Sequence, residues 1–194
     1  GVCSCVYLYI NGEYQGSYIF TEKVGLSNNS IDVDEELAYM LESSTNERGK
    51  YYKLMNDIYL NDVSDADWTN GTNLNEWFNG KQFFGFLDGG NYTVNGIYYP
   101  DTADTWVGLI PQILAAGGTT AAADGSKASI KNLGIRNSLI QGGYAGAFVG
   151  KPDTDNGILI ENCFADSSVT VIGTIREGGI MASTQKKNVI IKSL

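Results

Sequence analysis

A cluster of aromatic residues contains the side chains of this sequence that are best suited to hold a ligand. Tyr98 and Tyr99 precede the short turn 100–104, and Trp106 follows it. An aromatic face with hydrogen-bonding groups at its edge suits the apolar face and the hydroxyls of a sugar ring. The predicted ligand-binding residues, if the chain binds carbohydrate, are Tyr98, Tyr99, Trp106, Asp101 and Asp104.

Strand alternation sets a condition on these residues. Successive side chains of a strand point to opposite faces, so at most one of Tyr98 and Tyr99 is expected in the core. If Val107 is inside, the Trp106 indole is outside by the same rule. The open alternative is that Trp106 folds over the protein surface as packing and meets no ligand.

The sequence offers little for catalysis. A polysaccharide-cleaving site needs clustered carboxylates or a base beside the sugar, and the chain has no histidine. Arg136 and Asp166 both stand six residues after a repeat start, so they are expected to pair across adjacent strands as a surface ion pair. The segment 153–157 begins like a calcium loop, but position twelve is Phe164 where a glutamate is required.

No cofactor or metal is expected. Cys3 and Cys5 lie two apart in one expected strand, where a disulfide is geometrically awkward. A metal site would need further ligands, and the sequence supplies neither a second cysteine pair nor a histidine. Cys163 is expected in the core.

Charge and hydropathy exclude two classes of partner. With 22 acidic and 13 basic residues the formal net charge is -9, and the basic residues are scattered, so nucleic acid is not an expected partner. No apolar run reaches the roughly 18 to 20 residues that a membrane span requires, so no membrane insertion is expected.

The first 48 residues are predicted to form a separate β-hairpin segment. Asn11-Gly12 stands between two β-rich runs, residues 5–10 and 14–24, and both turn positions of such a hairpin favour positive φ. Residues 34–43 are compatible with a short helix. A polar stretch then leads to the second predicted domain, 49–194.

A repeat of about 30 residues runs through this second domain. The pattern hydrophobic-x-polar-hydrophobic begins at Val94, Ile130, Ile160 and Ile191, with spacings of 36, 30 and 31 residues. A second pattern begins at 107, 145 and 178, at spacings of 38 and 33. Short strands at this period without a helical pattern predict a mainly β fold, a right-handed parallel β-helix (solenoid). The alternative is an antiparallel sandwich.

The β-helix prediction specifies a core. Equivalent positions of successive repeats should stack as ladders, with Asn132, Asn162 and Ser193 at a corner. Trp77 and Phe83 either cap the open end of the core or contribute to a sugar site. The residues expected to be buried are Val94, Ile130, Leu133, Phe148, Ile160 and Cys163.

Two resemblances are visible. The segments 51–60 and 83–96 look like the opening coils of bacterial surface β-helix proteins, and Gly143–Gly150 with 178–180 resembles the GLUG-type repeats of secreted bacterial adhesins. Residues 6–18, with Thr21-Glu22-Lys23, are similar to part of the CotH-type spore-coat kinase family. The first resemblance implies export and display at the cell surface, and no universal active site. The catalytic segment of the second family does not follow here, so no catalytic residue carries over.

These observations together predict a non-catalytic extracellular or cell-surface scaffold of bacterial type that contacts carbohydrate or another surface protein. The chain begins and ends within apparent strands and is expected to be a piece of a longer protein, truncated at its C-terminus. The alternatives are a polysaccharide-degrading β-helix enzyme and an inactive fragment of a CotH-like kinase.

Overall fold

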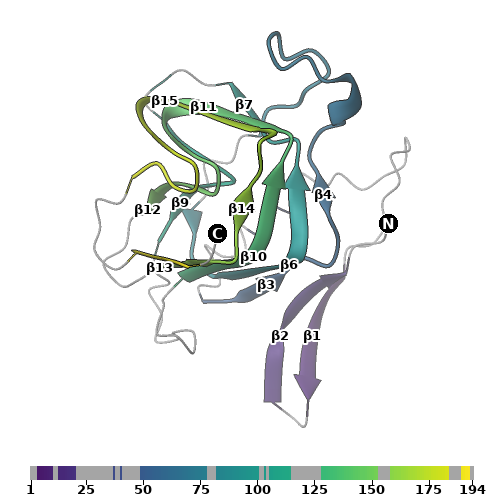
Figure 1. The fold of residues 1–194 in the computed structure, drawn as a ribbon. Coiled ribbons are helices and arrows are strands. Elements are labelled where there is room, and N and C mark those ends of the chain that lie inside the picture. Colours follow the sequence, from purple (N-terminus) through teal and green to yellow (C-terminus); the bar gives the residue numbers. More distant parts are fainter. Residues whose placement is uncertain are drawn as a thin grey trace.

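A computed structural model describes most of the second predicted domain and part of the first. The described residues are 4–10, 13–20, 37, 40, 49–77, 82–100, 103, 105–114, 128–152, 158–183 and 189–192. They form a mainly β structure, drawn in Figure 1, in which three parallel sheets surround one apolar core.

An antiparallel hairpin comes first. Strands β1 (Ser4–Ile10) and β2 (Glu13–Phe20) pair with each other, with an irregularity after Leu8. This confirms the predicted hairpin, whose turn at Asn11-Gly12 lies outside the described residues. In Figure 1 the hairpin extends away from the stacked sheets. Of the expected helix at 34–43, the described residues Leu37 and Met40 are helical and buried.

The first sheet contains strands that are far apart in the sequence. Its main path runs β16-β13-β10-β6-β3, while β14 pairs with β10 and β4 pairs with β6. The strands are β3 (Tyr51–Lys53), β4 (Ile58–Tyr59), β6 (Phe86–Asn95), β10 (Ala128–Arg136), β13 (Ile158–Glu161), β14 (Phe164–Ala165) and β16 (Val189–Lys192).

The second and third sheets repeat this arrangement. The second has the order β15-β11-β7, with β8 also paired to β11, and the third has the order β12-β9-β5. Their strands are β5 (Gln82–Phe83), β7 (Tyr98–Pro100), β8 (Trp106–Val107), β9 (Ile110–Ile113), β11 (Ser138–Gly146), β12 (Val149–Pro152) and β15 (Val169–Gly178).

The chain visits the sheets in a fixed order. One pass runs from β6 through β7 and β8 to β9, the next from β10 through β11 to β12, and a third from β13 through β14 to β15. Met181 then forms a parallel bridge to Val149 of the third sheet before the chain returns as β16. Every pairing among these strands is parallel, which contradicts the antiparallel alternative.

The predicted ladder is confirmed where the repeat is close to 30 residues. Ile130 pairs with Ile160, and Ile160 with Ile191. Ile191, also expected inside, is 42% exposed on the last strand, so for this residue the pairing is confirmed and the burial is not. The six residues predicted to be buried, Val94, Ile130, Leu133, Phe148, Ile160 and Cys163, have exposed fractions of 0–1%. Trp77 and Phe83 are also buried, at 4% and 0%.

The register predicted for the first repeat is wrong. Val94 pairs with Ile135, and the partner of Ile130 is Leu87. The reason is local: β6 carries extra residues at 89–91, opposite Asn132, where the pairing shifts. The second pattern, predicted to begin at 107, 145 and 178, is displaced by one residue at its last occurrence. Gly178 pairs with Gly146 and not with Ala145.

Asparagines form the corner that interrupts the first sheet. Asn132 and Asn162 adopt positive φ, at 53° and 52°, a conformation that asparagine tolerates better than most residues. Asn162 Nδ2 donates to Asn132 Oδ1 at 3.2 Å, and Asn132 Nδ2 donates to Asp88 Oδ1 at 3.0 Å. The backbone bend and the side-chain ladder therefore favour the same residue type, and the predicted corner is confirmed for these two residues, while Ser193 lies outside the described residues.

A column of alternating charge lies beside this corner. Across the sheet the paired residues are Lys53, Asp88, Lys131, Glu161 and Lys192. Lys131 Nζ is 3.6 Å from Glu161 Oε2, and Lys192 Nζ is 3.9 Å from Glu161 Oε1. Such exposed pairs each contribute about 0.2–1 kcal/mol at most. Because a register slip would separate these opposite charges, the column favours one register.

The isoleucine ladder predicts a strong position effect. Ile160→Asp should lower the free energy of unfolding by about 4 kcal/mol or more, because an unpaired carboxylate would enter the buried column. Ile190→Asp is the matched control, since Ile190 is 47% exposed, and should change stability by about 0.5 kcal/mol or less. Chemical denaturation measures both, and equal losses in the two variants would be inconsistent with the stacked core.

The asparagine corner gives a second prediction. Asn132→Gly and Asn132→Ala both remove the ladder hydrogen bonds, but only alanine is strained at a φ of 53°. The alanine variant should therefore be less stable than the glycine variant by about 1 kcal/mol. Denaturation midpoints of the two proteins decide this, and an alanine variant as stable as the glycine variant would contradict the corner geometry.

Candidate functional site

Strand pairing in the second sheet brings Trp106 beside Tyr144. Val107 and Ala145 pair with each other and are fully buried. Because side chains alternate along a strand, the residue before each of them points outward. Trp106 and Tyr144 are both partly exposed, so the prediction that the indole lies outside when Val107 lies inside is confirmed.

The two rings form a stack. Their centroids are 3.9 Å apart and their planes differ by 14°. Aromatic pairs of this kind contribute about 0.5–1.5 kcal/mol beyond the burial of their area. Stacking covers one face of each ring, so a ligand would meet their outer edges and uncovered faces.

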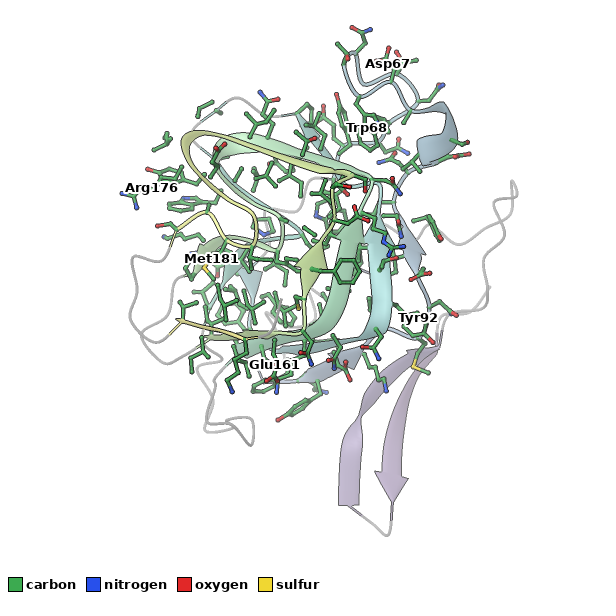
Figure 2. All side chains as sticks on the ribbon, viewed as in Figure 1. Asp67, Trp68, Tyr92, Glu161, Arg176 and Met181 are labelled. Carbon is green, nitrogen blue, oxygen red and sulfur yellow. The ribbon has the colours of Figure 1, made fainter. Side chains whose placement is uncertain are left out.

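Two cationic side chains flank the stack. Lys151 Nζ lies over the Trp106 ring, 5.3 Å from its centroid, within the range of a cation–π interaction. Arg176 pairs with Tyr144 on the next strand, and its Nη1 donates to Ser183 Oγ at 3.2 Å. Figure 2 shows Arg176 at the outer rim of the sheets, directed away from the core. We call Trp106, Tyr144, Lys151 and Arg176 the aromatic–cation surface.

The structure corrects the expectation for the tyrosine pair. Tyr98 and Tyr99 are both only 6% exposed, so neither offers a free face to a ligand. Tyr99 belongs to the core cluster, whereas Tyr98 points outward and is covered by a loop. The Trp68 ring lies against the Tyr98 ring, with centroids 6.1 Å apart and an angle of 57° between their planes. The Tyr98 hydroxyl lies next to Gly71. Alternation alone could not predict this cover, which comes from a distant segment that projects beyond β7 in Figure 2.

The two predicted acidic residues, Asp101 and Asp104, lie outside the described residues. Among the predicted site residues that the structure describes, Tyr98 and Tyr99 are buried and Trp106 is partly exposed. Tyr144, Lys151 and Arg176 are the residues that sequence reasoning missed. A signal for Tyr144 was present, since it precedes Ala145 as Trp106 precedes Val107 in the same repeat element.

The predicted ion pair is confirmed. Arg136 Nε is 3.1 Å from Asp166 Oδ2, and the guanidinium lies 5.5 Å from the centroid of the Phe164 ring. The pKa of Asp166 is lowered, first by hydrogen bonds from the Ser168 hydroxyl and backbone and then by the charge of Arg136. These contacts close the turn between β14 and β15, which is a structural role.

Other acidic residues also serve their own loops. Asp62 accepts hydrogen bonds from the hydroxyl and backbone of Ser64, and Asp67 accepts from the Asn70 side chain and from the backbone of Asn70 and Thr69. Both carboxyl pKa values are lowered by these bonds. Within the described residues, no three His, Cys, Asp or Glu side chains gather into a possible metal site.

Cys163 is a core residue and a poor nucleophile. Burial raises the pKa of its thiol to about 11, and its Sγ lies 3.3 Å from the Glu161 carbonyl oxygen. A thiol with such a pKa is almost entirely protonated near neutral pH, and the thiolate is the reactive form. The structure thus assigns it to packing, as predicted.

No helix among the described residues is both long and apolar enough to cross a membrane.

Comparison with known proteins finds one similar protein. No family model matches the chain, and no solved structure matches it. The protein named halomucin, from Haloquadratum walsbyi (strain DSM 16790 / HBSQ001), is 24% identical over 157 residues, which cover 79% of this chain. The alignment covers 2% of halomucin, so this chain spans a small part of that relative's length.

The buried thiol allows a test of the native packing. In a Cys3→Ser/Cys5→Ser background at pH 8, Cys163 should react with a thiol reagent far more slowly than a free cysteine and should react fully in denaturant. Reactivity should rise as the pH approaches about 11, the folded-state pKa. Rapid labelling of the native protein at pH 8 would show that this part of the core is open.

Proposed function

We propose that the chain is a non-catalytic extracellular binding scaffold, and that carbohydrate binds at the aromatic–cation surface. The observation that carries this proposal is the partly exposed stack of Trp106 and Tyr144. Aromatic rings beside hydrogen-bond donors combine a surface for the C–H groups of a sugar with partners for its hydroxyls. Lys151 and Arg176 supply donors at the two sides of the stack.

We also propose that the three parallel sheets are part of a right-handed parallel β-helix. The fixed order in which the chain visits the sheets supports this, as does the in-register pairing of Ile130, Ile160 and Ile191. In a solenoid each pass adds one strand to each wall, so side chains on one wall form extended outer surfaces that suit binding. The aromatic–cation surface spans two such walls, with Trp106, Tyr144 and Arg176 on the second sheet and Lys151 on the third.

The proposed location is the cell surface or the extracellular space. The glycine-rich units at 143–150 and 178–180 resemble GLUG-type repeats of secreted adhesins, and the similarity to a protein whose name denotes a mucin is in keeping with this setting. The hairpin segment is proposed to derive from a CotH-like domain without its catalytic part. A second surface protein is the alternative partner for the same wall.

We do not propose catalysis at the described carboxylates. Asp166 is engaged by Ser168 and Arg136, and its lowered pKa keeps it ionised, which does not suit a general acid. Asp62 and Asp67 are held in the same way by neighbouring residues of their loops.

Removal of one ring of the stack tests the proposal. Trp106→Ala should weaken binding to polysaccharides by about tenfold, because it removes the largest aromatic contact area of the surface and a loss of about 1.4 kcal/mol corresponds to a tenfold weaker affinity. The measurement is calorimetry or affinity electrophoresis against a panel of acidic and neutral polysaccharides.

The matched control is Tyr59→Ala, which removes an aromatic ring that is 53% exposed on the first sheet. It should leave binding unchanged. The proposal fails if the wild-type chain binds no polysaccharide in the panel, or if Trp106→Ala and Tyr59→Ala bind as well as the wild type.

A further inference from the structure

The charges on the second and third sheets differ from those of the whole chain. The formal net charge of the chain is -9, and the first sheet carries the alternating column described above. The described strands of the second and third sheets carry three ionisable Lys, Arg, Asp or Glu residues, namely Lys151, Arg176 and Glu177. Two of these three are cations, and both belong to the aromatic–cation surface.

The third charge does not neutralise this surface directly. Glu177 pairs with Ala145, which is fully buried, so it stands on the opposite side of β15 from Arg176. Its Oε2 accepts a hydrogen bond from the backbone nitrogen of Gly173 at 3.2 Å. The carboxylate is therefore directed to its own strand.

Neutral polar residues lie beside the cations on the described strands. Gln112 pairs with Lys151 and with Gln82, and Gln82 Nε2 donates to Gln112 Oε1 at 2.8 Å. Gln141 occupies an outer position on β11, before Tyr144. These amide side chains carry no charge and add hydrogen-bond donors and acceptors.

We propose that the ligand of the aromatic–cation surface is an acidic saccharide, whose carboxylate or sulfate groups pair with Lys151 and Arg176 while its ring contacts Trp106 and Tyr144. This inference rests on the proposed function and specifies its ligand class. Arginine presents a planar fork of donors that matches carboxylate and sulfate oxygens, and lysine adds a point charge.

The overall negative charge does not prevent such binding. At physiological ionic strength the Debye length is about 8 Å, so charges on remote parts of the protein are largely screened at this surface. The nearby cations act within that distance, and hydrogen bonds between charged groups are roughly twice as strong as neutral ones. Binding should consequently weaken as sodium chloride is added.

The test uses two pairs of polymers with matched backbones. Polygalacturonate is compared with its carboxyl-reduced form, and dextran sulfate with dextran, on the full 194-residue chain. We expect at least one anionic polymer to bind about tenfold or more tightly than its neutral counterpart. If one anionic polymer binds and the other does not, the result identifies carboxylate or sulfate as the recognised group.

Charge-removing variants complete the test. Lys151→Gln and Arg176→Gln should each weaken binding to the anionic polymer by about tenfold, and both variants should remain folded at the assay temperature, as checked by their thermal midpoints. Lys192→Gln removes the same charge from the first sheet and should bind as the wild type does.

Three outcomes overturn the inference. If anionic and neutral polymers bind equally well and Trp106→Ala weakens both, the proposed function stands and a specific acidic ligand is excluded. Equal weakening by Lys192→Gln would assign the preference to net charge and not to this surface. Binding of no polymer at all would overturn the proposed function and this inference with it.

Discussion

In-register stacking of buried side chains is the interaction on which the rest of the structure depends. The contact between Ile130 and Ile160 in adjacent parallel strands removes both side chains from water, and it also fixes which residues face outward, because the two faces of a strand alternate. Once Val107 and Ala145 are paired and buried in the second sheet, Trp106 and Tyr144 must stand next to each other outside. The aromatic–cation surface is thus a consequence of the core.

The corners convert this stacking into three walls. An extended strand continues in one direction, and the chain bends at residues that accept positive φ. Asn132 and Asn162 do so in the first sheet and hydrogen bond to each other, while Asn137 and Gly96 serve the following corner, where Gly96 N donates to the carbonyl of Asn137 at 3.0 Å. Corner residues therefore stack as the core residues do.

The sequence predicted those features that local pattern determines. The ladder from Ile130 to Ile191, the buried Cys163 and the pairing of Arg136 with Asp166 all follow from a constant period, and each is present. Prediction failed where residues outside the regular repeat are added, either within a strand or in a loop that covers it. The extra residues of β6 displaced the register at Val94, and the loop containing Trp68 covers Tyr98. The spacing of the repeat does not show where extra residues are accommodated within a strand, and it does not show which side chains a loop covers. Arg176 was missed for a related reason, because its role depends on a partner, Tyr144, that lies one full pass earlier.

A double-mutant cycle on stability tests the juxtaposition of Trp106 and Tyr144 most directly, because it needs no ligand. The free energies of unfolding of Trp106→Ala, Tyr144→Ala and the double variant are compared with that of the wild type. If the rings stack at 3.9 Å, the loss in the double variant should be smaller than the sum of the single losses by about 0.5–1.5 kcal/mol. Additive losses would mean that the two residues, 38 positions apart in the sequence, are not in contact and do not form one surface.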